Sequence, residues 1–142
     1  KPKINACYER GTTQNIAGST DGVVDYATKV YDLCNCVTTG ASWKFTAPKA
    51  ARYRVTAYYE HSSNTWATNH RVTHRLGKNG SVIRILERRY GNAQNIVLGV
   101  GGSCELDLAV GDYINSYANQ DSGGGQFLNN DASTNYICIQ EL

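Results

Sequence analysis

Residues 51–59 read Ala-Arg-Tyr-Arg-Val-Thr-Ala-Tyr-Tyr, and this stretch carries the clearest statement about the fold. Its apolar positions run from Tyr53 to Tyr59 in steps of two, and the positions between them begin with the charged Arg52 and Arg54. Successive side chains of a β-strand point to opposite faces, so this alternation is typical of a strand with one face in a core. Residues 104–110, Cys-Glu-Leu-Asp-Leu-Ala-Val, repeat the pattern, which predicts an all-β protein.

Turn signals separate the short segments on either side of these two strands. The Asn79-Gly80 pair favours a tight hairpin because both residues tolerate positive φ. The segment Asp121-Ser-Gly-Gly-Gly125 is too rich in glycine to hold a strand and is expected to be a loop. Gly99-Val-Gly-Gly-Ser-Cys104, which lies between two expected strands, is interpreted as a loop or bulge. We expect a last strand over residues 135–142 and about ten short antiparallel strands in all. No repeat or linker interrupts them, so residues 1–142 are predicted to form a single domain.

The composition excludes several classes of protein. The 142 residues include 14 Gly and only 18% charged side chains, which argues against coiled coils and disorder. A net charge of +2 with scattered Lys and Arg lacks the electrostatic footprint of a nucleic-acid-binding protein. No apolar run approaches the roughly 18 residues that a membrane span needs, so no membrane insertion is expected. Because the chain contains no Met, we expect a C-terminal fragment of a longer protein.

The five cysteines form an odd number in a chain large enough to fold without disulfides. This favours free thiols in a reducing cytosol. Cys34 and Cys36 have the C-x-C spacing of half a zinc site, but no second pair with a similarly short spacing exists. The sequence therefore predicts free thiols, no metal and no cofactor.

One segment indicates a second buried surface. In residues 82–86, Val82 and Leu86 lie on one face of the expected strand, while Ile83 and Ile85 lie on the other. Tyr58 likewise faces away from the core-facing positions of its strand. A two-sheet sandwich has one core, so apolar residues on both faces favour a subunit interface. The alternative is that amphipathic tyrosines cover outer faces alone.

Several motifs occur in an order that resembles the C1q-like domain, a trimeric jelly roll related to tumour necrosis factor. These motifs are Ala41-Ser-Trp-Lys-Phe-Thr-Ala-Pro48 followed by Ala51-Arg-Tyr-Arg-Val-Thr-Ala57, Tyr31-Asp32 ahead of Val37-Thr-Thr-Gly40, Leu76-Gly-Lys-Asn-Gly80, and Leu106-x-Leu-x-x-x-Gly-Asp112-Tyr113. The similarity covers essentially the whole chain, with Ala51 standing where the family usually has Gly. The resemblance implies a homotrimeric jelly-roll β-sandwich.

The richness in Asn, Thr and Ser is more similar to microbial and bacteriophage members than to animal complement proteins. Such modules sit at the tips of phage tail fibres and spikes. The resemblance therefore implies a head that trimerises and binds a host cell-surface glycan or protein receptor, in a virion assembled in the host cytoplasm. A bacterial extracellular C1q-like ligand-binding protein is the alternative.

Catalytic motifs are sparse. Glu105 and Asp107 lie two apart on one face of a strand, as in some jelly-roll glucanases, but the further Glu that those enzymes need as general acid is replaced by Val110. A solvated strand face is the simpler interpretation, and the chain is predicted not to be an enzyme. A jelly-roll carbohydrate-active enzyme remains as a minor alternative.

Metal-binding patterns are equally weak. His70 and His74 are four apart on one expected strand, and a threefold axis would gather three copies of one of them. Surface or interface histidines are the commoner outcome. Asp121 and the run Asn129-Asn-Asp131 match no calcium loop and are expected to form turns.

Binding remains as the predicted function. Aromatic rings and amide side chains hold sugars in shallow sites, and the ligand-binding candidates occur in polar or turn segments. These candidates are Trp66 and His61 in the expected polar loop 61–69, Tyr90 and Asn92 at a turn, and Gln126 after the glycine loop. Trp66 has interface packing as its alternative role. The candidates for the trimer interface are Tyr58, Arg54, Ile83 and Ile85.

Overall fold

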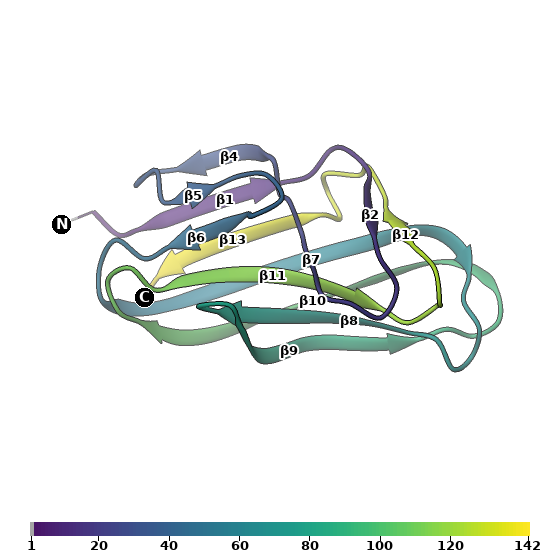
Figure 1. Ribbon diagram of the computed structural model, residues 1–142. Coiled ribbons are helices and arrows are strands. Elements are labelled where there is room, and N and C mark those ends of the chain that lie inside the picture. Colours follow the sequence, from purple (N-terminus) through teal and green to yellow (C-terminus); the bar gives the residue numbers. More distant parts are fainter. Residues whose placement is uncertain (1) are drawn as a thin grey trace.

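The computed structural model describes residues 2–142 and forms a sandwich of two antiparallel sheets (Figure 1). The strands in these residues are β1 (Asn5–Glu9), β2 (Gln14–Ile16), β3 (Gly22–Val23), β4 (Thr28–Asp32), β5 (Val37–Thr38), β6 (Lys44–Thr46), β7 (Ala51–Thr65), β8 (Arg71–Lys78), β9 (Ser81–Tyr90), β10 (Asn95–Leu108), β11 (Tyr113–Gln120), β12 (Gln126–Leu128) and β13 (Tyr136–Glu141). The all-β prediction is confirmed, and residues 2–142 contain no helix long and apolar enough to cross a membrane.

Each sheet joins strands that are far apart in the sequence. Sheet A has the order β2-β12-β7-β13-β1-β4, with β10 along the other side of β7. Sheet B has the order β5-β6-β11-β8-β9, with β3 beside β11. The first and last strands, β1 and β13, are direct neighbours, so both ends of the chain lie at one end of the sandwich (Figure 1). This crossing pattern is that of a jelly roll, as predicted.

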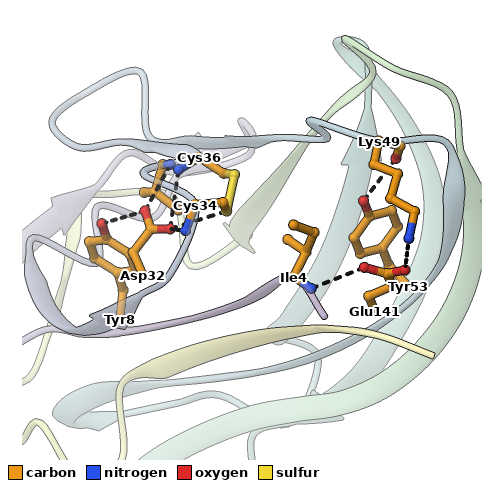
Figure 2. The surroundings of a disulfide bond; sticks show 9 residues. Ile4, Tyr8, Asp32, Cys34, Cys36, Lys49, Tyr53 and Glu141 are labelled. Atoms are coloured by element: carbon orange, nitrogen blue, oxygen red, sulfur yellow. Dashed lines mark hydrogen bonds and ion pairs between the residues drawn. A yellow bond between two sulfur atoms is a disulfide. The ribbon is translucent and has the colours of Figure 1, made fainter. Parts of the chain in front are cut away.

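A polar contact holds the two ends of the chain together. The carboxylate of Glu141 accepts a hydrogen bond from the backbone N–H of Ile4 at 3.0 Å and pairs with Lys49 (Figure 2). The Lys49 ammonium, which donates to this carboxylate, lowers the pKa of Glu141. The first and last strands are therefore joined by side-chain contacts as well as by the strand ladder.

The core lies between the sheets and is rich in aromatic rings. On β7, the alternating positions Tyr53, Val55, Ala57 and Tyr59 are at most 1% exposed, which confirms the predicted strand face. Such rings remove large apolar areas from water and stabilise the sandwich. The fully buried Trp43 makes an edge contact with the ring of Tyr26, with centroids 5.5 Å apart.

The glycine-rich segment 99–104 does not form the expected loop or bulge and instead belongs to β10. The reason is the neighbouring Tyr58, whose ring lies flat across this strand. A Cβ atom at Gly99 would stand 2.1 Å from the Tyr58 hydroxyl, and one at Gly101 would stand 2.5 Å from the ring. Glycine in this strand thus makes room for a tyrosine from β7 rather than marking a break.

The prediction of free thiols is wrong for four of the five cysteines. Cys7 pairs with Cys138, and Cys34 pairs with Cys36, while Cys104 keeps its thiol. Cys7 and Cys138 are register partners on β1 and β13, so the sheet brings them together across a sequence separation of 131. Cysteine number alone does not reveal which strands will pair.

Candidate functional site

Strand β9 is exposed along most of its length, although many of its residues are apolar. Val82 and Ile83 are each 43% exposed and Ile85 is 46% exposed. The strand lies at the edge of sheet B and pairs only with β8 among the described strands. An exposed apolar edge strand is an association hazard in a monomer and is typical of an interface.

The irregular pairing of β8 with β9 explains why both faces of β9 are apolar. The register shifts twice, between His74 and Arg75 and again between Leu76 and Gly77. Each shift interrupts the strict alternation that would send every apolar side chain into the core. Leu86 still packs against the core, whereas Ile83 and Ile85 remain in solvent in the single chain.

The outward face of sheet A carries a second distinctive surface, which is mainly polar. Arg54 donates to Glu105 on the neighbouring β10, and Arg52 donates to Asp107 in the same way. The Arg52 hydrogen bonds and charge lower the pKa of Asp107. Glu105 and Asp107 are each directly opposite their arginine in the strand register. The two carboxylates are therefore engaged in ion pairs and are not poised as an acid and a nucleophile.

Two tyrosines form an aromatic patch on this same face. The rings of Tyr58 and Tyr136 are stacked, with centroids 6.3 Å apart and planes inclined by 15°. Burial against the glycines of β10 raises the pKa of Tyr58, with the charge of Glu60 adding to the effect. The Tyr58 ring is thus fixed as a flat apolar surface beside the ion pairs of β7 and β10.

A hollow of about 180 Å³ opens on the outward face of sheet A. Its lining comes from four neighbouring strands and includes Tyr31, Arg54, Thr56 and Gln140. Drug-sized ligands occupy pockets of about 300–1,000 Å³, so this hollow is better suited to one or two protein side chains. Of the predicted interface residues, the structure places Arg54 at the hollow and Tyr58 on the same face, whereas Ile83 and Ile85 lie on β9.

The prediction that Trp66 and His61 contact a ligand is wrong, because both side chains are 0% exposed. Strand β7 extends to Thr65, so His61 lies in a strand rather than in a polar loop. Its ring packs edge-on against Trp66, with centroids 5.2 Å apart. Burial lowers the pKa of His61 to about 4. These two residues belong to an aromatic cluster inside the sandwich.

His74 is also in the core, which corrects the expectation of a surface or interface histidine. Its Nδ1 lies 3.1 Å from the carbonyl of Val100, and its Nε2 lies 2.6 Å from the Ser116 hydroxyl. Burial lowers the pKa of His74 to about 4. His70 precedes β8 and accepts a hydrogen bond from the backbone of Ala67, so the two histidines do not form a pair.

The remaining ligand candidates occupy turns and strand ends. Tyr90 is 57% exposed at the end of β9, and the side chain of Asn92 accepts a hydrogen bond from the backbone of Gln94. Gln126 donates to the hydroxyl of Ser122. None of the three lines the hollow on sheet A, so their binding role stays a prediction.

Asp32, Cys34 and Cys36 form a cluster that the sequence patterns did not predict. Within residues 2–142, the potential ligand atoms of Asp32, Cys34 and Cys36 lie within 4.8 Å of one another. The D-x-C-x-C spacing of these residues is the sequence feature that could have predicted the cluster.

The expected turn role of Asp131 is confirmed, because it accepts a hydrogen bond from the backbone of Ser133.

Comparison with known proteins identifies the fold class. No protein-family model and no curated protein sequence matches the chain. The structure of Eiger TNF from S. frugiperda superposes with a TM-score of 0.73 at 12% sequence identity, covering 100% of this chain and 94% of that one. A structure of murine APRIL has a TM-score of 0.68 at 11% identity, covering 99% and 100%. The chain has the jelly-roll fold of the tumour necrosis factor and C1q-like proteins, as its motifs predicted.

Proposed function

We propose that this chain is a non-catalytic binding head that works as a homotrimer. The observation that carries the proposal is the exposed apolar strand β9 in a subunit whose sheet A has a hollowed outward face. The two surfaces differ in residues and in shape, so β9 of one subunit can pack against sheet A of the next. Contacts between unlike surfaces are heterologous and form a closed ring when the rotation between subunits closes.

In the proposed trimer, Ile83 and Ile85 of one subunit pack on sheet A of the next. The hollow beside Arg54 is of the right size to receive aliphatic side chains, and Tyr31 at 44% exposure and Tyr58 add apolar area to this mainly polar face. Specific interfaces bury about 800 Å² per partner, so the proposed contact extends beyond the two isoleucines to neighbouring residues of both surfaces. The motif resemblance to trimeric jelly rolls supports three subunits rather than two.

Receptor binding is the proposed task of this trimer. Tyr90, Asn92 and Gln126 project from turns and strand ends, where loops on a rigid scaffold commonly carry recognition. The ligand class is a cell-surface glycan or protein. The proposed location is the tip of a phage tail fibre or spike, which the C1q-like motifs and the polar Asn, Thr and Ser composition support.

An extracellular ligand-binding protein is the second candidate, and the disulfides favour it. The pairs Cys7–Cys138 and Cys34–Cys36 are characteristic of proteins that mature in an oxidising compartment. Neighbouring genes distinguish the two settings, because virion structural genes support the fibre and an upstream secretion signal supports the extracellular protein.

A carbohydrate-active role has less support, because Arg54 and Arg52 engage the two candidate carboxylates. A glycan array probed with the wild-type protein tests binding and turnover together. We expect retention of one glycan class without new reducing ends, and loss of retention in Tyr90→Ala or Gln126→Ala. Polysaccharide turnover that disappears in Asp107→Asn would contradict a non-catalytic head, and absence of retention on both glycans and host cells would contradict receptor binding.

A further inference from the structure

The loop after β4 is organised around the carboxylate of Asp32 (Figure 2). Its Oδ1 accepts hydrogen bonds from the backbone N–H groups of Cys34 at 3.2 Å and Cys36 at 3.1 Å. Its Oδ2 accepts from the backbone N–H of Val37 at 3.2 Å and from the hydroxyl of Tyr8 at 3.0 Å. Four N–H or O–H groups therefore donate to one side chain, and two of them belong to the cysteines. The Cys34 sulfur, which carries no proton while the disulfide is closed, lies 3.3 Å from the same Oδ1.

None of these four hydrogen bonds has a sulfur atom as its donor, so none of them requires the Cys34–Cys36 bond. A carboxylate has about four lone-pair sites, and all of those on Asp32 are engaged by donors. Burial and the hydrogen bond to Asp32 raise the pKa of Tyr8 to about 12, so its hydroxyl keeps its proton and continues to donate. The loop is thus expected to keep its shape when the Cys34–Cys36 bond is opened.

The two sulfur atoms are brought together by local chain geometry. Asn35 has a φ of 52°, a left-handed conformation that Asn tolerates better than most residues. Across this turn the sulfur atoms of Cys34 and Cys36 are joined in a disulfide. The adjoining Leu33 is 69% exposed, so the loop lies at the surface of the subunit.

We propose that Cys34 and Cys36, when reduced, form a bidentate thiolate site for a thiophilic metal ion such as Zn²⁺, and that their disulfide is the closed state of this site. Thiolates are the ligands that soft and borderline metals prefer. Two protein ligands leave coordination positions for water or an external donor, so the site exchanges metal rather than supporting the fold. Asp32 is a positioning residue, because its oxygens are already occupied by donors.

Opening and filling the site are balanced steps. A dithiol reductant supplies two electrons, breaks the bond between Cys34 and Cys36 and leaves as its own disulfide, while each cysteine sulfur takes up a proton. Binding of Zn²⁺ then releases these two protons to solvent. Asp32, Cys34 and Cys36 do not line the hollow of sheet A, and the readout is zinc binding rather than association of subunits. The failure of this proposal is therefore distinguishable from the failure of the proposed function.

The test is zinc stoichiometry measured by native mass spectrometry on oxidised protein and on protein reduced and then freed of reductant without oxygen. We expect one Zn²⁺ per chain after reduction, none before it, and none in reduced Cys34→Ser or Cys36→Ser. Cys104→Ser is the matched control and keeps the ion. Because reduction also reaches Cys7 and Cys138, alkylation counting on the same samples reports which thiols are free.

The role of Asp32 is tested separately with Co²⁺ as a spectroscopic stand-in for Zn²⁺. Asp32→Asn is expected to weaken binding about 10- to 100-fold, as loss of a supporting residue does, while the thiolate charge-transfer band keeps its intensity at saturation. A reduced wild-type chain that binds no zinc, or Cys34→Ser that binds it as tightly as wild type, would overturn the metal site. An unchanged Co²⁺ affinity in Asp32→Asn would overturn the positioning role.

Discussion

Strands β7 and β9 are both long, yet they divide their residues between core and solvent in different ways. On β7, inward positions such as Val55 and Tyr59 are fully buried, and outward positions such as Arg52 and Arg54 carry charge. On β9, the aliphatic Ile83 and Ile85 are nearly half exposed. A strand such as β7, whose inward-facing apolar side chains are buried within one subunit, needs no partner to cover them. Strand β9 leaves apolar side chains exposed, and a second subunit would cover them.

The largest loss of stability is expected when a side chain on the buried face of β7 is removed. Tyr59→Ala removes a fully buried ring and its hydrogen bond to the carbonyl of Thr73 at 2.8 Å. Truncation of a large core aromatic costs about 3–5 kcal/mol, so the free energy of unfolding in a denaturant titration should fall by this amount. A loss below about 1 kcal/mol would contradict the assignment of Tyr59 to the core.

The free energy of unfolding is expected to depend on pH because of His61, which lies near the end of β7. The pKa of His61 is about 4 in the folded chain and near 6.5 in the unfolded chain. Between these two values the unfolded state binds a proton that the folded state does not bind, so acid favours unfolding. Stability is full above pH 6.5 and falls by about 3 kcal/mol as the pH drops to 4. His74, whose folded pKa is also about 4, adds a similar loss over the same window.

Unfolding free energies measured from pH 7.5 to 4.5 check this dependence. His61→Phe should reduce the slope of the free energy of unfolding against pH. An equal slope in wild type and His61→Phe would show that His61 does not contribute to the acid loss.

The variant Ile85→Asp tests whether the exposed face of β9 contacts a second subunit. A buried isoleucine contributes roughly 1.5–3 kcal/mol, so its replacement by a charge should weaken each subunit contact at least tenfold. Stability of the dissociated chain should change little, because the side chain is exposed there. Val110→Asp is the matched control, since Val110 is 69% exposed in the turn after β10. Equal weakening by both variants, measured by sedimentation, would contradict a role for β9.

The smallest effect is expected on the outward face of β7. Glu105→Gln removes the partner of Arg54 in an ion pair whose side chains are 49% and 43% exposed. Exposed pairs contribute about 0–1 kcal/mol because water and salt screen them. Denaturant titration of the dissociated chain should therefore place this variant within about 1 kcal/mol of wild type, and a loss above 3 kcal/mol would mean that the pair is structurally essential.

Local patterns predicted much of this fold. The alternation in residues 51–59 indicated β7, and Asn79 with a φ of 52° followed by Gly80 at 83° confirms the predicted hairpin between β8 and β9. The two-faced apolar pattern around Ile83 and Ile85 correctly indicated side chains that the single-chain core does not receive. These features are determined by residues that are close together in the sequence, so local sequence patterns can predict them.

Features that depend on distant partners were missed. The strand through Gly99 and Gly101 was interpreted as a loop because the ring of Tyr58, which needs that space, comes from another strand. The burial of His61 follows from the length of β7, and the Cys7–Cys138 pair follows from the register of β1 with β13. In each case the deciding contact joins segments that no local pattern relates.

The absolute mass of the particle in dilute solution, measured by light scattering on a sizing column, tests the proposed trimer most directly. The account predicts about three times the chain mass of 15.6 kDa for the wild-type protein, falling toward one chain mass in Ile85→Asp. A wild-type particle that stays at 15.6 kDa as its concentration is raised would contradict the trimer and leave the apolar surface of β9 without its proposed partner.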